Sequence, residues 1–318
     1  MLFGKIRRRH VALLCATAVT STLLAGVPQA ISQNSSLVKI DGSSTVFPIT
    51  EAVAEEFQKE NGNIRVAVGV SGTGGGFKKF CAGETHISGA SRPIKQKEID
   101  LCKENGIEED DMVELAVAYD ALTIVIHKDN TWAANMTTAE LKKMWEAAAD
   151  GKVTKWSDVN PAWPDADLKL YGPGTDSGTY DYFKEAILDK GDSRSDYTAS
   201  EDDNVLVLGV SRDKNALGFF GLSYYEENKD KLKAVNVDGG DGPVGPSSET
   251  VNNGTYTPLS RPIFIYVNTE KAKAEAPVAR FVRYYLNNAA KFSAEVAYVP
   301  LPESMYRDAR RDFNSAVR

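Results

Sequence analysis

The folding of this chain is constrained most by a regular alternation between β-branched apolar runs and segments with helical spacing. A β-branched run at 63–70 leads directly into a glycine-rich helical segment at 71–83. Further helical patterns lie at 45–62 and 94–106, and a long apolar, β-branched run covers 112–129. Strands that alternate with helices predict an α/β fold built from mixed, mostly parallel sheets flanked by helices.

The length and the apolar runs together predict two lobes. The 318 residues, 42% of them hydrophobic, suffice to bury ordinary cores. The strand-like runs at 117–127 and 262–268 are natural crossing points between lobes. Lobe I then joins 37–120 with 262–318, and lobe II holds 121–261. Two crossings of this kind form a hinge, with a ligand cleft between the lobes.

The first segment has the layout of a secretory signal peptide. Four basic residues within 5–9 precede a mainly apolar run at 11–27, and small residues follow near Ala30 and Ser32. We therefore expect residues 1–32 to be cleaved from a soluble, exported protein. A retained membrane anchor is the alternative, but threonines and a serine dilute the run.

The charge balance argues against nucleic-acid binding. Loss of the four basic residues with the leader changes the formal net charge from −7 to −11. Nucleic-acid binders need clusters of Lys and Arg for their phosphate contacts. No basic patch with interleaved aromatic residues is found in the sequence.

Two cysteines, Cys81 and Cys102, remain after the leader. In an exported protein such a pair predicts a disulfide bond, and two buried thiols are the alternative. A zinc site would need more ligands than His86, the one nearby candidate, so we expect no metal and no cofactor.

Three segments share the order strand, Gly/Ser/Thr loop, helix: 42–45, 71–74 and 176–179. A helix N-terminus carries free N–H groups and about half a positive charge, so it binds an anion without a basic side chain. Glycines let the backbone approach the ligand closely, and hydroxyls add donors. One such loop alone would be an ordinary helix cap. Three of them favour an anion site in a cleft.

Other glycine-rich motifs fit the segment at 71–77 poorly. Phe77 stands where the dinucleotide fingerprint G-x-G-x-x-G needs its last glycine, and the lysines miss the Walker pattern.

Charged residues refine the predicted ligand. Ser91 and Arg92 end a short strand, and Asp120 lies inside an apolar run. A buried carboxylate is costly unless paired, so a salt bridge for Asp120 is one interpretation. In the other, Asp120 accepts a hydrogen bond from a protonated anion such as monohydrogen phosphate, which sulfate cannot donate. Arg92 would supply a bidentate positive charge.

At these positions the chain resembles the periplasmic phosphate-binding proteins of high-affinity phosphate ABC transporters (PstS-type). The motifs DGSSTVFPIT, SGTGGGF, SGASRPI, DSGT and PLSRPIFIYVN occur in the family's order. The resemblance implies a two-lobed type II periplasmic-binding-protein fold, a periplasmic location, and delivery of inorganic phosphate to transmembrane permease subunits by a monomer. Carried over by position, the binding residues would be Ser44, Thr45, Val46, Ser71, Ser177, Gly178 and Thr179.

Two positions depart from the best-known enteric members. Arg92 stands where they have an Asp, and Pro173 stands where they have an Arg. We therefore expect the charges to be exchanged, with Arg92 as the cation and Asp120 as the proton acceptor; Asp176 is the second choice for the acceptor.

The alternatives are an exported phosphatase-like enzyme, a binding protein for sulfate or molybdate, and a surface protein that reuses the fold. The sequence has three histidines, one of them in the leader, and no nucleophile elbow or H-E-x-x-H motif. We therefore expect a binding protein and not an enzyme.

Overall fold

The two apolar runs expected to cross between lobes form the longest of the described strands, β4 (Met112–His127) and β12 (Ser260–Asn268). The computed structural model describes residues 36–175 and 177–318, so the expected leader and Asp176 lie outside it. β12 runs antiparallel to the first part of β4, up to the pair Ser260–Ala121. From Leu122 onward β4 pairs with β8 (Ala216–Gly221) instead. The two long strands therefore connect two groups of elements.

The first group is built on the sheet order β2-β1-β3-β12-β4. Its other strands are β1 (Ser36–Gly42), β2 (Ile64–Val70) and β3 (Ile87–Ala90). β1 is parallel to both β2 and β3, whereas β12 is antiparallel to both β3 and β4. Parallel and antiparallel pairings are thus equally frequent, so this part of the sheet is mixed without being mostly parallel.

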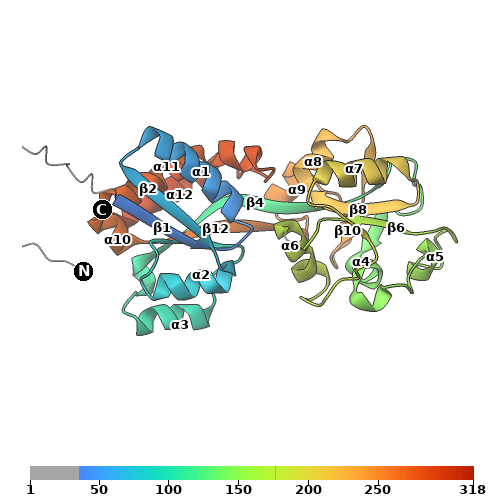
Figure 1. Cartoon of the computed structure of the whole chain (residues 1–318), viewed down its shortest axis with the longest axis horizontal. Coiled ribbons are helices and arrows are strands. Elements are labelled where there is room, and N and C mark those ends of the chain that lie inside the picture. Colours follow the sequence, from blue (N-terminus) through green and yellow to red (C-terminus); the bar gives the residue numbers. More distant parts are fainter. Residues whose placement is uncertain (1–35, 176) are drawn as a thin grey trace, which may run out of the picture. The chain divides into compact units, whose positions relative to one another are not determined.

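Helices cover both faces of this part of the sheet (Figure 1). One face carries α1 (Phe47–Glu60), α11 (Ala276–Glu295) and α12 (Glu303–Ala316), and the other carries α2 (Gly72–Cys81) and α3 (Gln96–Glu104). The short α10 (Thr269–Ala274) and a 3-10 turn, η1 (Glu109–Asp111), complete the group.

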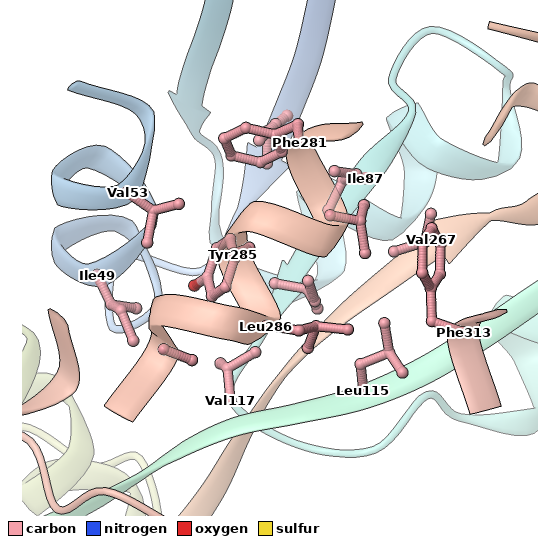
Figure 2. Packing of buried hydrophobic residues seen from close by; sticks show 14 of the residues in the cluster. Ile49, Val53, Ile87, Leu115, Val117, Val267, Phe281, Tyr285, Leu286 and Phe313 are labelled. Carbon is pink, nitrogen blue, oxygen red and sulfur yellow. The ribbon is translucent and has the colours of Figure 1, made fainter. Parts of the chain in front are cut away.

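The core of the first group lies between the sheet and the first helical layer. Figure 2 shows Ile49 and Val53 from α1 beside Phe281 and Tyr285 from α11, with Val117 of β4 below them. These side chains are fully buried, and burial of such a side chain contributes about 1.5–3 kcal/mol. The core fixes α1, and with it the turn that precedes α1.

The second group continues the sheet in the order β4-β8-β6-β7, and β9 also pairs with β4. Its strands are β6 (Lys169–Gly172), β7 (Thr198–Ala199) and β9 (Leu232–Ala234). A small separate sheet contains β5 (Asn135–Thr137), β10 (Asn236–Asp238) and β11 (Pro243–Val244).

The helices of this group are α4 (Thr138–Trp145), α5 (Trp156–Val159), α6 (Gly178–Ile187), α7 (Asp203–Arg212), α8 (Leu222–Glu227) and α9 (Ser248–Asn252), with the 3-10 turn η2 (Ala147–Ala149). Thr137 caps α4 by accepting a hydrogen bond from the Glu140 amide. Phe183 of α6 stacks on Phe219 of β8 with 4.1 Å between the ring centres, which fixes α6 on the sheet.

The expected disulfide bond between Cys81 and Cys102 is present and joins the end of α2 to α3. It lies in a small apolar cluster with Phe77, Phe80 and Phe264. Within the described residues, no helix is long and apolar enough to cross a membrane.

Candidate anion site

The turn from β1 into α1 is folded by close contact with β3. Gly42 has a φ of +154°, and a Cβ atom there would lie 2.1 Å from the Gly89 carbonyl oxygen, so only glycine fits. The Ser43 amide donates to that same carbonyl at 3.0 Å, and the Ser43 hydroxyl accepts from the Thr45 amide at 3.2 Å. These bonds hold Ser44 and Thr45 at the opening of α1.

The start of α6 lies against this turn. A Cβ atom at Gly178 would lie 3.6 Å from Thr45 Cα and 3.7 Å from Thr45 Oγ1. The Ser177 hydroxyl caps α6 by accepting from the Thr179 amide at 3.2 Å. Two helix openings with hydroxyl side chains therefore lie against one another. The first N–H groups of a helix have no acceptor inside the helix, which makes such openings suited to an anion.

The glycine-rich segment contributes Thr73 through the first turn of α2. Thr73 Oγ1 lies 3.1 Å from Ser91 Oγ and accepts from the Ser91 amide at 3.2 Å. The Ser71 hydroxyl, by contrast, donates to Asp41, which also pairs with Lys79 at 2.6 Å. The hydroxyl placed beside Ser91 is therefore that of Thr73.

Arg261 lies at the start of β12, and its guanidinium contacts residues of both groups of elements. Its Nε donates to Asp120 Oδ2 at 3.3 Å, its Nη2 to Thr45 Oγ1 at 3.3 Å, and its Nη1 to Glu185 Oε2 at 2.8 Å. The guanidinium lies 3.8 Å from the centre of the Tyr182 ring, and the side chain is 15% exposed. Arg261 thus links the turn before α1 to α6.

Asp120 is buried on β4 directly opposite Arg261 in the β4–β12 register. Burial raises the pKa of Asp120 above its usual value, and Arg261 partly offsets this effect. The salt bridge that the sequence left open for Asp120 is present, with Arg261 as its partner. One oxygen of Asp120 faces this cation, and Asp120 also lines a cavity.

Arg92 forms a bidentate ion pair with Glu98, with Nη–Oε distances of 2.8 and 2.7 Å. Burial tends to raise the pKa of Glu98, but hydrogen bonds from Arg92 and the Lys95 amide bring that pKa below its usual value. Glu98 therefore neutralises the guanidinium that was expected to meet the ligand.

Two cavities lie beside the Thr45–Gly178 contact, and Ser44 lines both. The first, of about 260 Å³, is named the arginine cavity and is lined by Ser43, Ser44, Thr45, Gly72, Thr73, Gly74, Ser91, Arg92, Asp181, Glu185, Lys190 and Arg261. The second, of about 290 Å³, is named the carboxylate cavity and includes Ser44, Asp120, Ser177, Gly178, Thr179, Asp203, Tyr224, Glu295 and Tyr298.

The structure thus gathers most of the residues expected at the site around these two cavities. Val46 is buried behind the turn, and its amide donates to the Ser43 carbonyl at 3.1 Å. Arg261, Thr73 and Glu185 were not predicted. Arg261 was visible only as the arginine in the PLSRP motif, and no pattern paired it with Asp120, 141 residues away. Which of these residues contact a ligand stays a prediction.

Across residues 36–175 and 177–318, no group of three or more His, Cys, Asp or Glu side chains is placed to hold a metal ion.

The chain is similar to known proteins over most of its length. A family profile described as the PBP superfamily domain matches residues 26–289. Protein SphX of Synechococcus elongatus is 56% identical over 309 residues, which cover 97% of this chain and 90% of SphX. The phosphate-binding protein PstS of Staphylococcus saprophyticus is 40% identical over 281 residues, covering 88% of this chain and 85% of that protein.

A solved structure described as a possible phosphate-binding protein from Planctomyces limnophilus is 47% identical and superimposes with a TM-score of 0.84. The superposition covers 89% of this chain and 99% of the other. The chain therefore belongs to the PBP superfamily, and within it to the PstS-type phosphate-binding proteins.

Proposed function

We propose that this protein captures inorganic phosphate at the meeting point of α1, α2 and α6 and delivers it to an ABC transporter. The observation that carries the proposal is the contact between the openings of α1 and α6, with Arg261 donating to Thr45 at 3.3 Å. Amides, hydroxyls and a guanidinium converge there, and these are the donors that a tetrahedral oxyanion accepts from. The family is one of substrate-binding proteins and not of enzymes.

In this proposal the ligand lies at Ser44, which lines both cavities. Donors from the first group are the hydroxyls of Ser44, Thr45, Ser91 and Thr73, with Thr73 in the place first given to Ser71. The Val46 amide is left out because it donates to the Ser43 carbonyl. Donors from α6 are Ser177, Thr179 and the Gly178 amide. Arg261 supplies the guanidinium that donates to Thr45, whereas both end nitrogens of Arg92 are held by Glu98.

We keep Asp120 as the residue that distinguishes phosphate from sulfate. Its carboxylate lines the carboxylate cavity, and an anion that carries a proton can donate to it. Sulfate has no proton to donate and would be repelled. Asp176, the second choice, lies outside the described residues.

Capture in this form needs two lobes that close on the ligand. We propose the boundaries 37–120 with 262–318 for lobe I and 121–261 for lobe II. We also propose that the leader directs the chain to the periplasm, where the mature protein acts as a monomer and meets the transmembrane permease subunits of a phosphate ABC transporter.

The test is calorimetric titration of the purified protein with phosphate, arsenate, sulfate and molybdate. We expect phosphate and arsenate to bind and sulfate to bind at least about a hundredfold more weakly, because it lacks the donated proton. Asp120→Asn should reduce this discrimination. Stronger binding of sulfate or molybdate than of phosphate would contradict the proposal.

A further inference from the structure

The arginine cavity contains a carboxylate of the protein itself at the place where its positive charges converge. Glu185, on the last turn of α6, accepts from Arg261 Nη1 at 2.8 Å and pairs with Lys190 at 3.2 Å. The pKa of Arg92 is raised mainly by its hydrogen bonds to Glu98, and the charge of Glu185 adds to this effect. Three cations thus act on one carboxylate.

Arg261 is neutralised twice in this arrangement. A guanidinium has five N–H donors, and here Nε faces Asp120, Nη1 faces Glu185 and Nη2 faces Thr45. A bidentate grip on an oxyanion uses two parallel N–H groups of the fork. Release of Glu185 would free Nη1, which with Nη2 forms the end edge of that fork.

The chain also positions a second partner for Glu185. Asp189 and Lys190, just after α6, have left-handed φ values of 52° and 66°, which side-chain-bearing residues rarely adopt. The Lys190 amide closes this turn on the Lys184 carbonyl at 3.0 Å. Residues held in such conformations often serve function. The turn here places an exposed ammonium beside Glu185.

We propose that Glu185 is an internal competitor for the phosphate site, which occupies Arg261 in the empty protein and keeps Lys190 as its remaining partner when the anion displaces it. This inference rests on the proposed function. Glu185 sits on the same helix whose first residues would bind the ligand, so movement of α6 toward phosphate and release of Glu185 are coupled. The carboxylate thereby lowers the affinity for anions, because an anion must displace it from Arg261 in order to bind there.

The experiment is calorimetric titration of phosphate into the purified wild-type protein, Glu185→Gln, Lys190→Gln and the double variant. Removal of the competing charge should tighten binding about tenfold in Glu185→Gln. Lys190→Gln should weaken binding about threefold, since displaced Glu185 loses its second partner. In the Glu185→Gln background, the Lys190 substitution should change affinity less than about twofold.

Asp181→Asn is the matched control, since it removes one negative charge from the same helix and the same cavity. It should change phosphate affinity less than about threefold. Unchanged or weaker binding by Glu185→Gln would overturn the inference, as would an equal gain in Asp181→Asn. Lys190 is exposed, so its variant tests the coupling even if Glu185→Gln folds poorly. Failure of the wild-type protein to bind phosphate would instead overturn the proposed function.

Discussion

The buried pair of Arg261 and Asp120 shows how one contact serves both stability and ligand capture. The Asp120 side chain is 5% exposed, and the only cation within salt-bridge distance among the described residues is Arg261. Desolvation of a carboxylate costs several kcal/mol, which a neighbouring guanidinium offsets in part. The pair therefore holds β12 against β4 at the edge of the site.

We expect Arg261→Met to lower the free energy of unfolding by about 3 kcal/mol, because it leaves Asp120 buried without its partner. The double variant Arg261→Met/Asp120→Asn should regain most of this loss, since no buried charge remains. Urea unfolding without phosphate measures both. Equal destabilisation of the single and double variants would show that packing of Arg261 on Tyr182, and not the ion pair, is what matters.

Asp203 makes stability depend on pH. It lines the carboxylate cavity, and burial, with Asp202 and Glu201 nearby, raises its pKa to about 6. A raised pKa favours the protonated form in the folded state. Its contribution to stability is therefore complete below the ordinary value near 4 and is lost as the pH rises through about 6.

Asp203→Asn should accordingly stabilise the protein by about 1–2 kcal/mol at pH 8 and by almost nothing at pH 4, a range that allows for partial solvent screening. Thermal unfolding at the two pH values gives the difference. Asp230→Asn, the same substitution in an exposed turn, is the matched control. A gain of the same size at both pH values would rule out titration of Asp203 as its source.

The sequence indicated some charged residues of the site but not their ion-pair partners. Asp120 stood out because a single acid in an apolar run needs a partner. Its partner was hidden because the β4–β12 register, and not a local pattern, places Arg261 opposite it. Arg92 was assigned to the ligand because nothing in the sequence marked Glu98 as its partner. The side chain of Glu98 turns back to receive both Arg92 and the first amide before α3.

Among the structural elements, α2 explains why the chain concentrates glycines at 72–76. A Cβ atom at Gly76 would lie 2.5 Å from Gly42 Cα and 3.1 Å from the Asp41 carbonyl oxygen, so glycine lets α2 pack directly on β1. At Gly74 the nearest neighbour would be Glu98 Oε1 at 3.9 Å, which is ordinary contact. The two glycines therefore serve different purposes.

We expect Gly76→Ala to destabilise the protein by about 2 kcal/mol or more, because backbone atoms cannot move aside without separating α2 from β1. Gly74→Ala, in the same helix, should be neutral or stabilising by up to about 1 kcal/mol through helix propensity. Chemical unfolding of both variants compares them directly. A similar loss in both would indicate that flexibility of α2, and not its close packing, requires the glycines.

The helix starts and most strands were accessible from sequence because hydrophobic periodicity and Gly/Ser/Thr loops are local signals. Strand direction was not. The mixed character of the sheet arises because β12, from late in the chain, inserts between β3 and β4 and runs antiparallel to both. Such insertion depends on contacts between residues far apart in sequence, for which one sequence offers no pattern.

For the molecule as a whole, β4 is the strand that takes part in the sheets of both groups. Its partner changes from β12 to β8 between Ala121 and Leu122, and the Leu122 amide donates to Leu259 at 3.0 Å. The lobe boundaries near 120 and 262 remain a prediction, and closure about them is what capture between lobes requires.

Amide hydrogen exchange tests capture between lobes directly. If phosphate bridges the openings of α1, α2 and α6, peptides that cover 43–47, 72–76 and 177–181 should all exchange more slowly with phosphate, with one common midpoint concentration. Stabilisation by a ligand at a hundredfold excess over its Kd is about 2.7 kcal/mol, which is ample for detection.

Sulfate at the same concentration should protect none of these three peptides, and peptides from α12 should not respond to either anion beyond the global effect. Protection of 43–47 and 72–76 without 177–181 would mean that the anion binds to the first group alone, and capture between two lobes would then be wrong for this protein.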